Sequence, residues 1–207
     1  CKDVTYASDN ETVASVDENG KVTAKAAGTA VITATSAAGK TAQYKLTVKT
    51  PSVKMNASAK TLYVKGSPAT VTLKATTAGV TGKVTYTSSK PSVAAVAANG
   101  KVTAKTAGTA VITAKCGNYK ATCKITVKKP AVKASASAKT VFVGGTSQIK
   151  VEKTGVSGKV TYTSSNKSVA VVSAGGKVTA KKAGTATITV KCGSYKATCR
   201  ITVKKGS

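Results

Sequence analysis

The sequence predicts an all-β protein made of tandem antiparallel β-sandwiches arranged end to end. Three observations support this fold class. The stretch from Val84 to Val127 returns at Val160 to Val203 with 34 of 44 positions identical, and a more diverged copy opens the chain. The large apolar residues are mostly valine and isoleucine, which favour strands. Short apolar–polar alternations are separated by glycine-rich turns, as expected for half-buried strands.

The repeats divide the chain into three predicted domains, 1–50, 51–129 and 130–207, named here the first, second and third repeats. A complete repeat is about 80 residues long, enough to bury one modest core. The first repeat lacks a counterpart of residues 51–80, which would supply two or three opening strands. Either a longer protein has been truncated, or another chain donates the missing strands by β-strand addition.

The third repeat contains every expected element in order. Its alternating segments predict strands at 132–137, 140–143, 147–152, 159–164, 169–172, 178–181, 185–192 and 195–203. Glycine at Gly144-Gly145 and Gly175-Gly176 marks tight turns, because glycine permits a positive φ. Short strands with turns every 8–12 residues or so are typical of a small antiparallel β-sandwich.

Four motifs recur in the repeats: Val-Thr-Tyr, Ser-Val-Ala, Gly-Lys-Val-Thr-Ala-Lys and Ala-Gly-Thr-Ala. Together they resemble the bacterial immunoglobulin-like (Ig-like) domain, group 2. The resemblance implies Ig-like sandwiches, with Tyr6, Tyr86 and Tyr162 as an aromatic plug where that family usually carries tryptophan. It also implies modules that mostly space or bind surfaces in adhesins, cell-wall enzymes and phage tail proteins. The fold alone does not settle the role.

The net charge of +27 is unevenly distributed. Residues 1–50 carry a net charge of +1, whereas residues 51–129 and 130–207 carry +13 each. The positive electrostatic field of residues 51–207 favours polyanionic partners, either an anionic cell-wall polymer or a host glycan. A single arginine and the absence of interleaved aromatic residues weigh against nucleic acid. The simpler interpretation is that lysines on outward strand positions keep the protein soluble and discourage edge pairing.

The cysteines predict two disulfides, Cys116–Cys123 and Cys192–Cys199. In each pair the alternation places both residues on the core face of adjacent strands, with six residues between them around a hairpin. The first repeat has Ser36 and Tyr44 in the corresponding places. Disulfides would indicate an oxidising, extracellular setting. Cys1 is left over, as a free thiol, a lost pairing or a lipid-modified first residue.

The composition argues against catalysis, metals and cofactors. The chain has no histidine, and the second repeat has no carboxylate, so we expect no enzyme, no metal site and no cofactor. The acidic cluster Asp9, Glu11, Asp17 and Glu18 is interpreted as solvated turn residues rather than a calcium site. No apolar run approaches the ~20 residues of a membrane span, and the absence of a signal peptide suggests a fragment.

We therefore expect a non-catalytic Ig-like repeat stalk or adhesion module of a bacterial cell-surface or secreted protein, located outside the cell. The alternatives are accessory spacer or wall-binding modules of a larger surface hydrolase, and a phage fibre or tail decoration. Candidate binding residues lie at two hairpin tips, although the same tips could equally be packing caps: Tyr119, Lys120, Tyr195 and Lys196.

Overall fold

The computed structural model describes residues 4–206, and within that range it contains strands and turns but no helix. Two compact units are present. One comprises Cys1–Asn56, Ala75–Thr85 and Ala114–Ala121, and the other comprises Ala57–Lys74, Tyr86–Thr113 and Thr122–Ser207. The second repeat is thus shared between the units, and the division into three domains stays a prediction from the sequence repeats.

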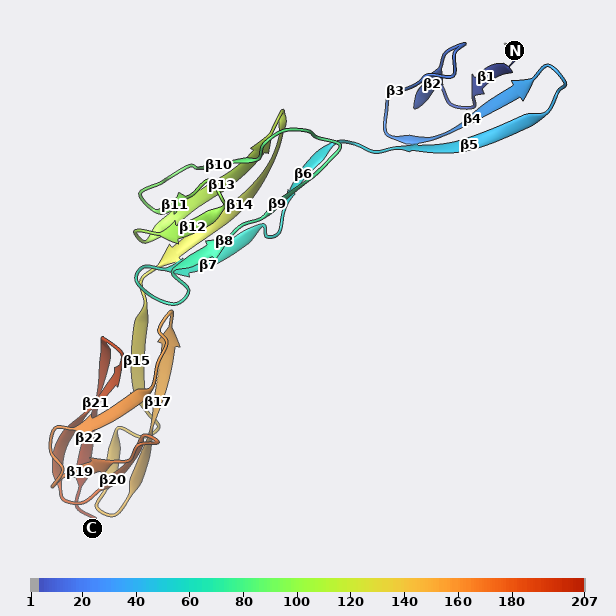
Figure 1. Cartoon of the computed structure of the whole chain (residues 1–207). Coiled ribbons are helices and arrows are strands. Elements are labelled where there is room, and N and C mark those ends of the chain that lie inside the picture. Colours follow the sequence, from blue (N-terminus) through green and yellow to red (C-terminus); the bar gives the residue numbers. More distant parts are fainter. Residues whose placement is uncertain (1–3, 207) are drawn as a thin grey trace. The chain divides into compact units, whose positions relative to one another are not determined.

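The first repeat forms two small sheets (Figure 1). A three-stranded antiparallel sheet has the order β1-β4-β5, and a two-stranded sheet pairs β2 with β3. Its buried cluster comprises Val13, Ala14 and Ala30, against which Leu46 and Val48 pack. The strands are β1 (Val4–Ser8), β2 (Ala14–Val16), β3 (Val22–Ala24), β4 (Gly28–Ser36) and β5 (Thr41–Val48).

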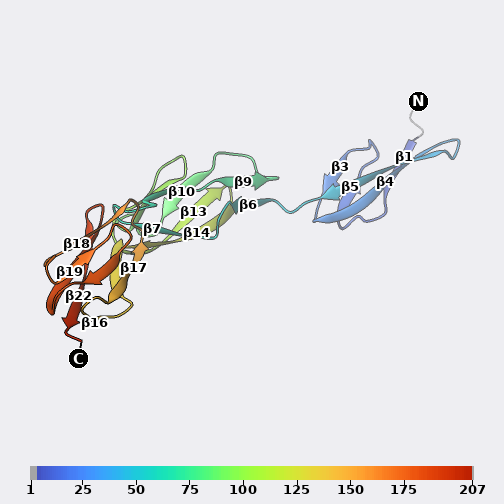
Figure 2. The same cartoon turned by 90° about the horizontal axis from the view of Figure 1, so that it is seen from below.

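The second repeat contributes nine strands to the two units. In the first unit β6 pairs antiparallel with β9. In the second unit β12 pairs antiparallel with both β11 and β8, and β14 pairs parallel with β7 (Figure 2). The strands are β6 (Ser52–Met55), β7 (Ala59–Tyr63), β8 (Thr70–Thr72), β9 (Ala75–Ala78), β10 (Thr85–Ser88), β11 (Ala94–Val96), β12 (Lys101–Ala104), β13 (Gly108–Cys116) and β14 (Tyr119–Lys128).

The third repeat is a sandwich of two four-stranded sheets, β15-β17-β20-β19 and β16-β22-β21-β18. Its core is one cluster to which Val141, Ile149, Val178, Ile188 and Ile201 contribute. The strands are β15 (Ala131–Ala136), β16 (Thr140–Phe142), β17 (Thr146–Thr154), β18 (Val160–Ser164), β19 (Ala170–Val172), β20 (Lys177–Ala180), β21 (Gly184–Cys192) and β22 (Tyr195–Lys204).

The predicted all-β fold and the strands of the third repeat are confirmed. In β17, for example, Ile149 is buried and Val151 half-buried, while the alternating Lys150 and Glu152 are exposed. The sheets are mainly antiparallel, as predicted, but β16 runs parallel to β22, just as β7 runs parallel to β14. In each case a strand near the start of the repeat lies beside its last strand, and most of the repeat forms the long connection that a parallel pairing requires.

The predicted aromatic plug takes the form of a tyrosine lying over a turn glycine. The Tyr162 ring is so close to Gly176 that an added Cβ would lie 2.9 Å from Cζ, and Tyr6 lies over Gly20 in the same way. Gly176 and Gly20 have φ values of 80° and 78°, which glycine adopts at little cost. Tyr162 is therefore engaged in packing the turn that precedes β20.

Candidate functional site

The most extended chemical feature of the surface is its lysine coverage. Every lysine that the structure describes is exposed, and so is Arg200. The strand pattern explains this placement: in β22, Cys199, Ile201 and Val203 face the core, while Arg200 and Lys204 face solvent. The second and third repeats therefore present a solvent-accessible positive charge of +13 each, with Glu152 as their one carboxylate side chain. Exposed charges of one sign attract polyanions.

The two predicted hairpin tips differ from each other. Tyr119 and Lys120 are both exposed at the start of β14. At the equivalent tip Lys196 is exposed but Tyr195 is half-buried. The second tip is a two-residue turn, Gly193-Ser194, which places Tyr195 directly opposite Cys192. The structure does not bring the two tips into one site: Tyr119 and Lys120 belong to one unit, and Tyr195 and Lys196 to the other.

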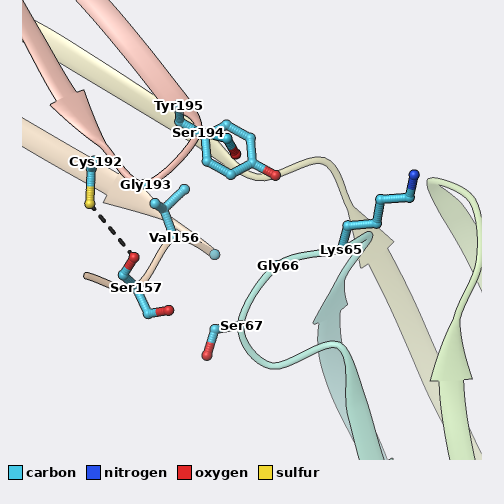
Figure 3. Close-up of a pocket in the computed structure, with 10 residues that line it drawn as sticks. Lys65, Gly66, Ser67, Val156, Ser157, Cys192, Gly193, Ser194 and Tyr195 are labelled. Carbon is cyan, nitrogen blue, oxygen red and sulfur yellow. Dashed lines mark hydrogen bonds between the residues drawn. The ribbon is translucent and has the colours of Figure 1, made fainter.

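Tyr195 borders a pocket of about 210 Å³ within the second unit (Figure 3). The loop after β7 forms one wall, where the Ser67 N–H donates to the Gly155 carbonyl at 3.0 Å. Ser157 and Ser194 supply further hydroxyl groups, whereas Lys65 extends away from them. The lining contains neither a carboxylate nor a histidine, so it offers no acid–base pair for catalysis. Sequence reasoning missed this pocket.

A second hollow of about 300 Å³ lies in the third repeat beside β18 and β19. Tyr162, Lys167 and Val172 are among the residues that line it. Tyr162 also covers Gly176, and the Ser164 hydroxyl donates to the Ala170 carbonyl at 2.7 Å. Tyr162 and Ser164 in this hollow therefore already have structural partners.

The predicted disulfides are wrong: Cys116, Cys123, Cys192 and Cys199 are all free and buried. The register of the third repeat gives the physical reason. Cys192 lies opposite Tyr195. Cys199 lies opposite Ile188, which precedes Cys192 by four residues in β21. Four residues span about 13 Å of strand, whereas a disulfide requires Cα atoms less than about 7 Å apart. Both thiols face the core as predicted, but they lie at different positions along the paired strands.

Each free thiol near a hairpin tip has the same structural role. The Cys192 thiol donates to the Gly158 carbonyl at 3.4 Å, and the Cys116 thiol donates to the equivalent Gly82 carbonyl at 3.4 Å. For Cys123, burial raises the pKa of the thiol, an effect that the Lys60 ammonium partly offsets. A raised pKa keeps the thiol protonated and therefore weakly nucleophilic. These cysteines pack as small apolar residues.

Denatured, unreduced protein is expected to present the thiols of Cys116, Cys123, Cys192 and Cys199 to a colorimetric thiol reagent. In the native protein the same four thiols should react at least about tenfold more slowly, because burial hides them from the reagent. Prior treatment with a reductant should change neither result. A count below four in the unreduced, denatured protein would show that disulfides are present.

The acidic cluster of the first repeat supports the turn interpretation for two of its members. Asp9 Oδ1 accepts from the Val31 N–H at 2.7 Å. Asp17 Oδ1 accepts from the N–H groups of Asn19 and Lys21 at 3.0 and 2.9 Å. Within residues 4–206 no group of three or more histidine, cysteine or acidic residues is placed to hold a metal ion. In the same range no helix is long and apolar enough to cross a membrane.

Models of protein families match most of the chain. The bacterial Ig-like domain (group 2) matches residues 1–48 and 127–203, and a bacterial Ig-like domain matches residues 82–129. The chain belongs to the bacterial Ig-like domain (group 2) family. The shorter match of residues 1–48 agrees with a partly incomplete first Ig-like repeat. No curated protein matches the sequence.

Solved structures that are similar to this chain include a surface layer protein and a bacteriophage capsid protein. Domains 1–6 of the surface layer protein SbsC match with a TM-score of 0.50 and 23% identity, over 99% of this chain and 35% of that one. A structure of the S-layer protein rSbsC(31-844) matches with a TM-score of 0.49, 23% identity and the same coverage. The three N-terminal domains of the bacteriophage RB49 outer capsid protein Hoc match with a TM-score of 0.48 and 13% identity, over 99% and 89%. The chain thus spans about a third of the SbsC structures.

Proposed function

We propose that this chain is a non-catalytic stalk or adhesion segment of a bacterial cell-surface or secreted protein. In this proposal the lysine-covered second and third repeats bind polyanionic polymers such as wall teichoic acid or a sulfated glycan. The observation that carries the proposal is the combination of exposure and charge. All described lysines are exposed, and 26 of the 27 units of net charge lie in residues 51–207.

Lysine coverage of this kind favours binding without a fixed geometry. A lysine ammonium is a flexible point charge, whereas arginine recognises phosphate or sulfate groups through a planar, bidentate fork. Lysines occur on many strands and loops of both repeats rather than in one pocket. A flexible polymer with repeating negative charges is the ligand that can contact many of them together. The use of the same fold in the surface layer protein SbsC supports the surface location.

Four lysines of the second repeat have equivalent lysines in the first repeat. They allow a comparison of two variants that have the same net charge. One variant replaces Lys101, Lys105, Lys124 and Lys128 of the second repeat by glutamine. The control replaces the equivalent Lys21, Lys25, Lys45 and Lys49 of the first repeat, all of which are exposed. Both variants have the same net charge, but only the first weakens the field of a repeat without carboxylates.

Binding to lipoteichoic acid and to heparin is expected to weaken several-fold more in the second-repeat variant than in the control. For the unmodified chain, affinity should fall by at least about tenfold between roughly 0.05 and 0.5 M NaCl, because salt screens exposed charges. Calorimetry or surface plasmon resonance measures both effects. Equal losses in the two variants, or binding that is insensitive to salt, would contradict the proposal.

A further inference from the structure

The second repeat carries an insertion in the loop that follows β7. It has seven residues from Val64 to Thr70, whereas the equivalent stretch of the third repeat, Val143 to Thr146, has four. Strand pairing fixes this equivalence, because Thr70 and Thr146 pair with equivalent residues of β12 and β20. We name residues 63–69 the junction loop. Its three extra residues are Ser67, Pro68 and Ala69.

The junction loop contacts the third repeat, within the second unit. The N–H of Ser67, one of the extra residues, donates to the Gly155 carbonyl at 3.0 Å. Gly66 lies so close to the third repeat that an added Cβ would be 2.5 Å from both the Gly155 oxygen and Pro130 Cγ. The Tyr63 ring lies against Gly155, where an added Cβ would overlap it. Figure 3 shows Gly66 and Ser67 across the pocket from the segment that follows Gly155.

The equivalent turn of the third repeat gives a comparison for the burial of the junction loop. Phe142 and Val143 occupy the positions of Tyr63 and Val64, because β16 pairs with β22 in the register in which β7 pairs with β14. Phe142 is 58% exposed and Val143 46% exposed, whereas Tyr63 and Val64 are half-buried. The contact with Gly155 contributes to this difference in burial.

Gly155 is suited to receive the tyrosine ring. It has a φ of 62°, and its equivalent in the second repeat, Gly79, has a φ of 61°. An added Cβ at Gly79 would lie 3.6 Å from Pro51, which is an ordinary contact distance. Both positions therefore favour glycine for its backbone conformation. At Gly155 the Tyr63 ring also takes the space that a side chain would need.

The backbone of the junction loop has a defined conformation. The Tyr63 N–H donates to the Pro68 carbonyl at 2.8 Å, and the Gly66 N–H donates to the Tyr63 carbonyl at 3.2 Å. Lys65 has a φ of 51°, and within residues 4–206 it is the only residue other than glycine with a positive φ. A residue with a Cβ keeps this unfavourable conformation where the surrounding contacts fix the chain. The loop can therefore hold a neighbouring domain in place.

We propose that the junction loop locks the third repeat to the adjoining part of the second repeat, so that residues 57–74 and 130–204 reorient together as one body. A single linker joins β14 to β15 through Lys129-Pro130, and the proline fixes its own φ. The junction loop adds a second connection, to Gly155. Two separate connections oppose the bending and twisting that one linker allows. The insertion is the determinant, because Ser67 is the donor to Gly155.

Residual dipolar couplings of the backbone amides test this proposal in the intact chain, aligned in a neutral medium. In the unmodified chain one alignment tensor should fit residues 57–74 and 130–204 together. Removal of Ser67, Pro68 and Ala69 gives the loop the length that the third repeat itself uses, and the couplings should then require two tensors. Gly155→Ala should also require two tensors, because its Cβ displaces the Tyr63 ring. The matched control Gly79→Ala should keep one tensor.

A double-mutant cycle assigns the effect to one contact and does not depend on the shortened loop. Gly155→Ala is expected to lower the thermal unfolding midpoint of the third repeat by at least about 4 °C. In the Tyr63→Ala background the decrease should be clearly smaller, because the ring that the Cβ would displace is absent. In the Phe142→Ala background, which removes the exposed equivalent ring, the full decrease should remain.

Three results would overturn the proposal. The first is a need for two alignment tensors in the unmodified chain, which would show that the repeats reorient separately. The second is a single tensor after removal of the three extra residues. The third is an equal effect of Gly155→Ala with and without the Tyr63 ring.

Discussion

Replacing Ile188 by alanine is expected to lower the free energy of unfolding of the third repeat by about 2–5 kcal/mol. Ile188 is fully buried in the core cluster of the third repeat, to which strands of both sheets contribute. Truncation would lose the transfer free energy of the removed methyl groups and leave a cavity. Urea denaturation followed by hydrogen exchange resolves the loss repeat by repeat.

The equivalent substitution in the first repeat provides the control. Ile32 occupies the same sequence position as Ile188, but it belongs to a repeat with a much smaller buried cluster. Ile32→Ala should therefore cost less than Ile188→Ala, because solvent can reach the space that it leaves. Equal losses would mean that the first repeat has a complete core in solution. Lys191→Ala, an exposed change in β21, should cost less than about 0.5 kcal/mol.

Replacing Gly176 by alanine is expected to destabilise the third repeat by about 1–3 kcal/mol. Two costs combine at this position. Gly176 has a φ of 80°, and a Cβ there would lie 2.9 Å from Tyr162 Cζ and 3.1 Å from Gln148 Nε2. Both the backbone strain and the displacement of the tyrosine ring should appear in the thermal unfolding midpoint.

Two neighbouring glycines separate these costs. Gly144 has a φ of 84°, but an added Cβ would meet nothing within 4 Å, so Gly144→Ala carries only the backbone strain. Gly175 is outside the left-handed region, and its Cβ would only approach Ser173 Oγ at 3.9 Å, so Gly175→Ala should be nearly neutral. The expected order of destabilisation is Gly176→Ala, then Gly144→Ala, then Gly175→Ala. If Gly176→Ala destabilises the repeat no more than Gly144→Ala does, the ring contact contributes nothing to stability.

The strands of the third repeat could be predicted because each depends on a local pattern. Alternation in a stretch such as Thr185 to Cys192 shows directly which side chains face the core, and glycine marks where the strand must turn. The exposure of the lysines follows from the same alternation. The parallel pairing of β16 with β22 could not be predicted, because it joins Thr140 to Thr202 and no local pattern records such a contact.

The cysteines show what the alternation of apolar and polar residues along a strand cannot predict. Alternation correctly placed Cys192 and Cys199 on the core face, but the distance between them depends on the register of the hairpin. A two-residue turn sets that register and offsets the two thiols by four positions. Likewise, the pocket beside Tyr195 requires the loop around Ser67 to reach Gly155, and neither segment contains a signal for that contact.

The parallel pairing of opening and closing strands has a mechanical consequence. Because β16 and β22 run in the same direction, tension that enters through β16 and leaves through β22 pulls the two strands past each other lengthwise. The ladder, including the bonds from Val143 N–H to Lys204 O and from Thr202 N–H to Lys139 O, is then loaded in shear, all at once. In an antiparallel hairpin that is pulled at its open end, the backbone hydrogen bonds break one at a time. β7 and β14 form the same parallel pairing over five residue pairs.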